Sequence, residues 1–266
     1  YDSQYGFRSL HSTEFAALEL TDRIISDIDE SKIPLAVFLD LSKAFDTINH
    51  DILLHKLNYY GVSGIALSWF KNYLSNRMQY VSFKDNVSSC ANISTGVPQG
   101  SVLGPLLFII YMNDISTVSK KFFFILFADD TSLLGPLCSF NYNLTSDPDI
   151  NKSLSNSINS ELQKIHEWLA LNKLSLNVQK TKFMIFHNPQ RKITKYIPSL
   201  SINGHQIEYV ETFNFLGLTL DEHLNWNAHI QKVANKISRA LGVMNRLKIF
   251  LPHNILKIIY NSLILP

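Results

Sequence analysis

The chain has 266 residues, 46% of them hydrophobic, and a formal net charge of +2 at neutral pH. This length provides a sizeable core for one large domain or two small ones, and so small a charge does not by itself indicate a nucleic-acid binder. Two isolated cysteines exclude a disulfide framework or a zinc site, and no apolar run approaches the roughly 20 residues that a membrane-spanning helix needs.

An amphipathic helix is predicted near the start of the chain, over residues 13–29. Its apolar positions are Phe15, Leu18, Ile24, Ile25 and Ile28. Residues 34–39 are apolar on both faces, which is typical of a strand buried at the centre of a sheet. This run ends in Asp40, a carboxylate that either faces a cleft or caps the segment that follows.

Two helices and a hairpin are predicted next. The first helix covers residues 49–60 and ends at Gly61, and the second covers residues 63–74. Residues 77–93 have the pattern of a hairpin that turns at residues 84–86.

A loop with glycine at each end and proline in the middle occupies positions 96–100. Glycine allows a close approach of backbone to a ligand and proline fixes φ, so this loop has flexible ends and a rigid middle. It leads into an apolar helix over residues 105–112, with a proline in the first turn. A plain turn between a strand and a helix is the alternative interpretation.

The tetrapeptide Phe127-Ala128-Asp129-Asp130 lies between two apolar runs, residues 122–126 and 131–134. This pattern predicts a β-hairpin with an acidic tip. Two adjacent carboxylates repel each other, whereas a hard cation such as Mg²⁺ binds one or two carboxylates together with substrate phosphates. The alternative is a solvated surface turn, in which Asp is common.

The buried strand and the acidic hairpin together predict a metal site. If the two lie side by side, Asp40 meets Asp129 and Asp130, and two cations about 3.5–4 Å apart among them would support phosphoryl transfer. Phe45 follows closely behind Asp40. Its ring could press on the sugar of a nucleotide and exclude a 2′-hydroxyl, or it could simply pack in the core.

The second half of the chain contains a predicted helix over residues 150–171, a strand over residues 181–186, and a hairpin over residues 200–210 that turns at Asn203-Gly204. The segment 135–160 is rich in Ser, Asn and Asp, so its first half is expected to be a surface loop.

A last helix is predicted over residues 226–248. Its apolar positions, expected to form a buried face, are Ile230, Val233, Ile237, Leu241 and Met244. Its basic positions, expected to form either a solvated face or a face that follows a phosphate backbone, are Lys232, Lys236, Arg239, Arg246 and Lys248.

Three motifs in this order resemble the central motifs of reverse transcriptases: FLDLSKAFD (residues 38–46), GVPQGS (96–101) and FADD (127–130). The sequences of these motifs are most similar to those of the non-LTR, LINE-type group of retrotransposons, with a Jockey-like character. The match extends over nearly the whole chain, and the joint occurrence in this order is specific although no single tripeptide is.

Further matches lie on both sides of these motifs. GFR (residues 6–8) and HST (11–13) resemble the fingers motif of that group, LSLN (174–177) with the following Lys180 resembles its fourth palm motif, and FLG (215–217) resembles its primer-grip hairpin.

The resemblance implies a role for each matching residue. The metal-binding residues would be Asp40, Leu41, Asp129 and Asp130, around two Mg²⁺ ions that Mn²⁺ could replace. The substrate-binding residues would be Arg8, Leu41, Phe45, Gln99 and Gly100. Phe215, Leu216 and Gly217 would form the primer grip, and Lys180, with Lys182 as its alternative, would protonate the departing pyrophosphate.

The implied fold is an α+β polymerase palm, an antiparallel sheet with helices on one face. Residues 1–34 would be part of the fingers, residues 35–222 the palm, and residues 223–266 the start of a helical thumb. The resemblance also implies that family fingers strands and part of the thumb are missing at the two ends, as in a fragment or a decayed copy.

The expected function is RNA-directed DNA polymerase activity, with an RNA template, a DNA primer and deoxynucleoside triphosphates as partners. A viral RNA polymerase, a group II intron maturase or retron enzyme, and a non-catalytic nucleic-acid-binding remnant are the alternatives. No signal peptide is visible, so an intracellular location, in the cytoplasm or nucleus, is expected without membrane association.

Overall fold

A computed structural model describes residues 3–138, 148–190 and 197–265 of the chain. The chain divides after Val210 into two compact units, Tyr1–Val210 and Glu211–Pro266. The surface loop expected in the first half of residues 135–160 falls largely on residues 139–147, which lie outside the described residues. None of the described helices is long and apolar enough to cross a membrane.

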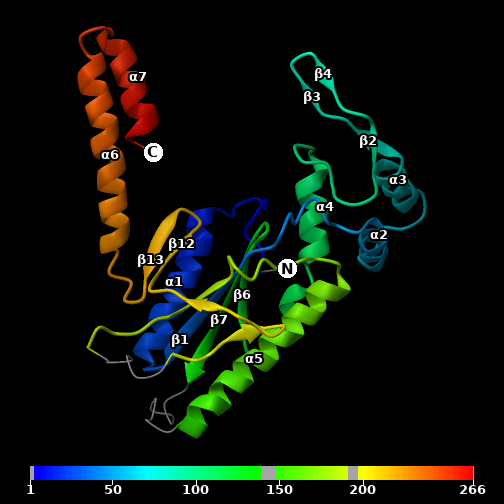
Figure 1. Ribbon diagram of the computed structural model, residues 1–266, viewed down its shortest axis with the longest axis horizontal. Coiled ribbons are helices and arrows are strands. Elements are labelled where there is room, and N and C mark those ends of the chain that lie inside the picture. Colours follow the sequence, from blue (N-terminus) through cyan, green and yellow to red (C-terminus); the bar gives the residue numbers. More distant parts are fainter. Residues whose placement is uncertain (1–2, 139–147, 191–196, 266) are drawn as a thin grey trace. The chain divides into compact units, whose positions relative to one another are not determined.

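The first unit is built on a five-stranded sheet in the order β11-β8-β1-β7-β6 (Figure 1). Its strands are β1 (Ile33–Leu39), β6 (Phe123–Phe127), β7 (Asp130–Cys138), β8 (Lys182–Ile185) and β11 (Glu208–Tyr209). The pairing is antiparallel throughout except between β8 and β11, which run parallel. All seven residues of β1 are buried, which confirms the predicted central strand.

Helices pack on both faces of this sheet. The helices of the first unit are α1 (Thr13–Asp29), α2 (His50–Tyr59), α3 (Gly64–Leu74), α4 (Leu103–Met112), the short η1 (Ile115–Thr117) and α5 (Pro148–Leu171). On β1, Leu35 and Val37 join the core cluster with α2, α4 and α5, so Ala36 and Phe38 point to the opposite face. Helix α1 covers that face and contacts β1, β6 and β7. The α+β class is therefore confirmed, with α1 added to the second face.

Helix α1 has its predicted bounds, but its apolar face was only partly predicted. The buried residues are Ala16, Ala17, Leu20 and Ile24. Phe15, Leu18 and Ile25 are at least half exposed, so their assignment to the packed face was wrong. Alanine lets a helix approach a sheet closely, and in α1 Ala16 and Ala17 are buried together with Leu20 and Ile24.

Two predicted turns are confirmed. The segment 77–93 forms paired short strands, β2 (Arg77–Gln79) with β5 (Ala91–Ile93) and β3 (Ser82–Phe83) with β4 (Asn86–Val87). Strands β9 (Ser201–Ile202) and β10 (His205–Gln206) flank a turn in which Asn203 and Gly204 both have positive φ, as the Asn-Gly pair predicts.

The second unit contains the hairpin β12 (Thr212–Phe215) and β13 (Leu218–Asp221), followed by α6 (Asn227–Leu247) and α7 (His253–Leu263). The buried carboxylate of Asp221 accepts hydrogen bonds from the backbone N–H groups of His223, Asn225 and Trp226. These bonds hold the turn before α6, where Trp226 adopts a φ of +64°.

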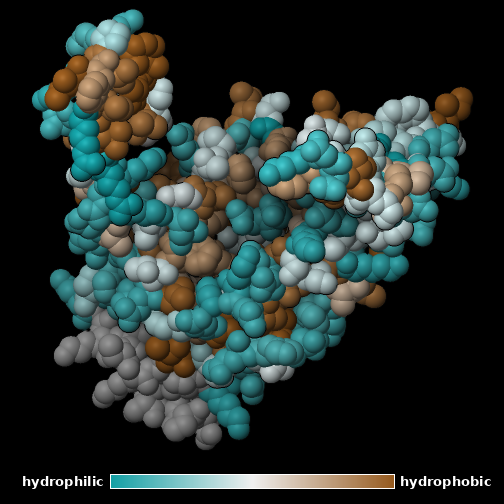
Figure 2. All heavy atoms as spheres, turned by 45° about the horizontal axis from the view of Figure 1, so that its top comes forward, coloured by the Kyte–Doolittle hydropathy of each residue, from teal (hydrophilic) through white to brown (hydrophobic). Residues whose placement is uncertain are grey.

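The prediction that α6 has a buried face was wrong. None of the described α6 residues is buried, and Ile230 and Leu241 are 60% and 50% exposed. Within its unit α6 packs against β13 and α7, which together cover too little of a helix of 21 residues. Figure 2 accordingly shows apolar surface over α6 and α7, at the upper left.

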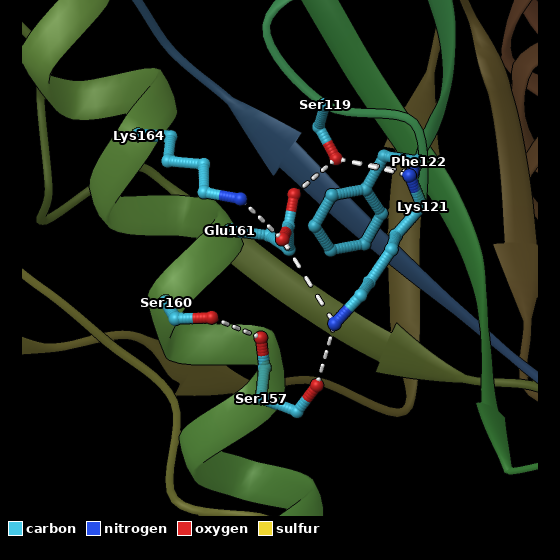
Figure 3. Close-up of polar contacts among 7 residues, drawn as sticks. All are labelled: Ser119, Lys121, Phe122, Ser157, Ser160, Glu161 and Lys164. Atoms are coloured by element: carbon cyan, nitrogen blue, oxygen red, sulfur yellow. Dashed lines mark hydrogen bonds and ion pairs between the residues drawn. The ribbon is translucent and has the colours of Figure 1, made fainter.

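Glu161 links α5 to the segment that precedes β6 (Figure 3). Its carboxylate accepts hydrogen bonds from Ser119 Oγ and Lys164 Nζ, both at 2.7 Å, and Lys121 Nζ lies 3.9 Å away. Burial by itself raises the pKa of Glu161, but the bonds from Lys164 and Ser119 and the charges of Lys164 and Lys121 outweigh it, so the pKa is lowered.

We expect Glu161→Gln to reduce the free energy of unfolding at pH 7 by about 1–3 kcal/mol, because a buried charge-assisted network loses its anion. Since folding lowers the pKa of Glu161, this stabilisation is complete above the unfolded value and disappears as the pH falls through the folded value. Urea unfolding of both proteins should show the difference shrinking below about pH 4.5. Glu167→Gln, on the exposed side of the same helix, is the control and should change little at any pH.

Candidate active site

The acidic tetrapeptide forms the tip of the hairpin β6–β7, as the sequence predicts. Phe127 pairs with Asp130, which leaves Ala128 and Asp129 as a two-residue turn. Ala128 has a φ of +55°, a conformation that such tight turns require at their first central residue. Both aspartates are exposed at the tip.

Asp40 lies beside this tip. The last register pair of β1 and β7 joins Leu39 to Thr131, so Asp40, which follows β1, lies next to Asp130. Although Asp130 is exposed as a whole residue, surrounding protein atoms partly desolvate its carboxyl and raise its pKa, and the negative charges of Asp129 and Asp40 raise it further. The structure therefore brings the three predicted carboxylates together.

The backbone of Asp40 is fixed by the segment that follows α5. Its carbonyl oxygen accepts a hydrogen bond from Asn177 N at 2.8 Å, and its N–H donates to Thr181 Oγ1 at 3.4 Å. Leu41, which is buried, continues this contact by bridging to Leu176. The segment that resembles the fourth palm motif therefore contacts the backbone of Asp40 and Leu41 directly.

Lys180 lies in the same segment, between Asn177 and Thr181 in the chain. Its Nζ lies 3.9 Å from Asp40 Oδ2. The side chain of Lys180 is 71% exposed and that of Asp40 is 38% exposed, and the separation is long for an ion pair, so the attraction is weak and compensates little of the negative charge. Lys182, the alternative, is engaged elsewhere, with Glu208 and the carbonyl of Gln179.

The carboxylates fit divalent cations. Their donor atoms are hard oxygens, the type that Mg²⁺ and Mn²⁺ prefer. Desolvation and then the charges of Asp129 and Asp40 raise the pKa of Asp130, and the long contact from Lys180 to Asp40 offsets little of this repulsion, so a bound cation would relieve an existing electrostatic cost.

The loop of residues 96–100 docks on the segment after Asp40. Val97 N donates to Phe45 O at 2.9 Å, Gly96 N donates to Ile48 O at 2.7 Å, and Gln99 Nε2 donates to Asp46 Oδ1 at 2.8 Å. Gly96 has a φ of +85°, and a Cβ there would lie 2.7 Å from a carbonyl oxygen, so only glycine fits. Gly100 also has positive φ, in open space.

Phe45 is half-buried and combines both predicted environments. Its ring stacks on Phe108 of α4 with the centroids 4.3 Å apart, and it meets the edge of Phe7 at 6.4 Å. The expected core packing is therefore present on one side. Its backbone lies between Asp40 and the loop that contains Gln99, which places it within the predicted nucleotide-binding segment.

The segment around Arg8 lies against the acidic hairpin. Tyr5 N donates to Leu126 O at 2.7 Å, and Leu126 N donates to Ser3 O at 2.8 Å. Arg8 Nη1 donates to the carbonyl oxygen of Gln4 at 3.0 Å. Gln4 itself, which is not among the predicted site residues, is buried against the hairpin tip.

The residues of the predicted primer grip lie at the tip of the hairpin β12–β13 in the second unit, with Leu216 and Gly217 as its turn. Phe215 pairs with Leu218, and Leu216 and Gly217 have φ values of +46° and +92°. Glycine at the second position of such a turn follows the preference of type I′ hairpins.

Comparisons with known proteins agree with this geometry. A family model described as reverse transcriptase (RNA-dependent DNA polymerase) matches residues 1–220. The RNA-directed DNA polymerase from the mobile element jockey of Drosophila melanogaster is 27% identical over 99% of this chain and 28% of its own length. A probable RNA-directed DNA polymerase from transposon BS of the same species is 28% identical over 88% of this chain and 25% of its own length.

The fold is also similar to that of solved structures. The apo telomerase of Candida tropicalis aligns with a TM-score of 0.53 and 13% identity, over 85% of this chain and 40% of the telomerase chain. The chain spans about a quarter of the length of the two curated relatives named above. Because the family model covers most of the chain, the protein belongs to the reverse transcriptase family and carries a domain homologous to those of non-LTR retrotransposons.

Proposed function

We propose that the chain extends a DNA primer on an RNA template by two-metal phosphoryl transfer. The observation that carries this proposal is the convergence of Asp40, Asp129 and Asp130 at adjoining strand ends. Residues 1–34, 35–222 and 223–266 would act as partial fingers, palm and the start of the thumb.

Asp40, Asp129 and Asp130 would hold two Mg²⁺ ions, with Leu41 as a further metal- and substrate-binding residue. When bound, the ions would lower the pKa of the primer 3′-hydroxyl and offset charge on the triphosphate. The 3′-oxygen loses its proton to solvent water and bonds to the α-phosphorus, and the bond from that phosphorus to the oxygen bridging to the β-phosphate breaks. Pyrophosphate leaves, and Lys180, whose Nζ lies 3.9 Å from Asp40 Oδ2, would donate a proton to it.

The other residues would position the substrates. Arg8 can bind triphosphate oxygens through its planar guanidinium, and Gln99 and Gly100 would border the incoming nucleotide and template. The turn of Phe215, Leu216 and Gly217 would hold the primer end. An RNA template and deoxynucleoside triphosphates imply an intracellular site of action, in the cytoplasm or the nucleus.

The test is extension of a labelled DNA primer on an RNA template by the purified 266-residue chain, with Mg²⁺ and deoxynucleoside triphosphates. The wild-type chain should add nucleotides, and EDTA or Asp129→Asn should abolish the product. The far-ultraviolet circular dichroism of the variant should match that of the wild type, because Asp129 is exposed at a turn and contributes little packing. Equal synthesis by both proteins would refute the proposal.

A further inference from the structure

The N-terminal segment extends the sheet beyond β6, its edge strand. Ser3 and Tyr5 exchange backbone hydrogen bonds with Leu126, and Gln4 forms a parallel bridge to the same residue. This contact lies three residues before Asp129 in the chain, so the segment is adjacent to the tip of the acidic hairpin.

The side chain of Gln4 reaches the tip itself. Gln4 is 1% exposed, and its Oε1 accepts hydrogen bonds from Gly6 N at 2.8 Å and from Ala128 N at 3.2 Å. A two-residue hairpin turn leaves the N–H of its first central residue outside the strand ladder. Gln4 supplies the missing acceptor for Ala128, the residue whose φ is +55°.

A close backbone contact between Gly6 and the turn also indicates that the N-terminal segment holds the hairpin tip. A Cβ added to Gly6 would lie 2.4 Å from Ala128 N and 3.1 Å from the carbonyl carbon of Phe127. The N-terminal segment therefore crosses the turn at a distance that only glycine permits. The turn is held between its own strands and this crossing segment.

The remaining polar atom of Gln4 shows which contact matters. Within the described residues, Nε2 is buried without a hydrogen-bond partner. A buried amide with an unsatisfied donor is unfavourable compared with an apolar side chain of the same size. The presence of a buried glutamine at this position is therefore explained by its Oε1, which accepts a hydrogen bond from the turn, and not by packing alone.

We propose that Gln4 is a positioning residue, whose carboxamide oxygen fixes the hairpin tip and so holds Asp129 and Asp130 on the side of Asp40. This inference rests on the proposed function, since it concerns the same metal site. It assigns to residue 4 a role that the resemblance of residues 6–8 did not include.

The test compares Gln4→Met with the wild-type chain, because methionine keeps the length and approximate volume but lacks the acceptor. Mn²⁺ is the probe, and its binding is followed by electron paramagnetic resonance on the folded proteins, with Asp130→Asn as the reference for a damaged site. We expect Gln4→Met to bind Mn²⁺ about tenfold more weakly, comparable to the loss of a supporting contact around metal ligands. Gln190→Met, an exposed glutamine outside the site, should bind as the wild type does.

Primer extension measured in parallel separates this inference from the proposed function. If the wild type binds Mn²⁺ but makes no product, the proposed function fails, while weaker binding by Gln4→Met still supports the positioning role. If the wild type extends primers and folded Gln4→Met binds Mn²⁺ with unchanged affinity, the positioning role is refuted.

A measurement on the wild-type chain covers the case in which Gln4→Met does not fold. The amide hydrogen of Ala128 should exchange slowly with solvent, since it is donated to a buried oxygen. Exchange at the rate of an open turn amide would show that the contact does not exist and would overturn the inference.

Discussion

Asp130→Asn is expected to lower the rate of nucleotide incorporation at least about 10³-fold and also to make the metal-free protein slightly more stable. The loss of rate follows because one charged ligand of the proposed cation site would become neutral, and several kcal/mol of transition-state stabilisation correspond to about this factor. The gain in stability follows because the charges of Asp129 and Asp40 no longer oppose a third charge.

The gain should be below about 1 kcal/mol, since the hairpin tip is open to solvent and salt screens the repulsion. Thermal unfolding at low ionic strength measures it, and single-nucleotide incorporation under rapid quench measures the rate. Mg²⁺ should raise the melting temperature of the wild type but not of the variant. Asp22→Asn, on the exposed side of α1, is the matched control.

Two outcomes would contradict this interpretation of the trio. One is an Asp130→Asn protein that incorporates nucleotides at the wild-type rate. The other is a variant that Mg²⁺ stabilises as much as it stabilises the wild type, because the cation would then bind somewhere other than these carboxylates.

The elements that carry the proposed metal site could be predicted because their signals are local. The run before Asp40 is apolar at every position, and a strand with that pattern has both faces covered. The acidic tip lies between two apolar runs separated by a short turn, and the hairpin forms there. The meeting of Asp40 with the tip required only that the two strands be neighbours.

Features that depend on contacts between distant segments could not be predicted in the same way. The packed face of α1 is chosen by close approach to the sheet, which favours Ala16 and Ala17 over Phe15 and Leu18. The apolar stripe of α6 has the spacing of a buried face, yet spacing alone does not state how much partner surface is available.

The same limit applies to the support of the site. The bond from Gln4 to the hairpin tip joins residues 124 positions apart, and the docking of Gln99 on Asp46 spans 53 positions. Glutamine near the start of a chain has no periodicity and no turn signal that would reveal such a partner. Gly96 was recognised as a loop glycine, but the steric reason, contact with the backbone of Asp46, appears only in the fold.

Phe45→Val is expected to reduce discrimination against ribonucleotides by about 10–100-fold, the range that a few carbon atoms supply in a substrate pocket. Phe45 is held from two sides, by stacking on Phe108 and by the bond from Val97 to its carbonyl oxygen. A ring fixed in this way cannot retreat from a 2′-hydroxyl, whereas valine leaves space for it. The measurement is the ratio of kcat/KM for dCTP to that for CTP, and the change should come mainly from improved use of CTP.

The stacking on Phe108 also means that Phe45→Val loses packing, which alone could lower activity with both nucleotides. Phe70→Val separates the two effects, because Phe70 of α3 is likewise half-buried against the core. That variant should lose stability without a change in the dCTP to CTP ratio. An unchanged ratio in Phe45→Val would assign Phe45 to the core alone, and discrimination against ribonucleotides would then have to depend on another residue that contacts the sugar.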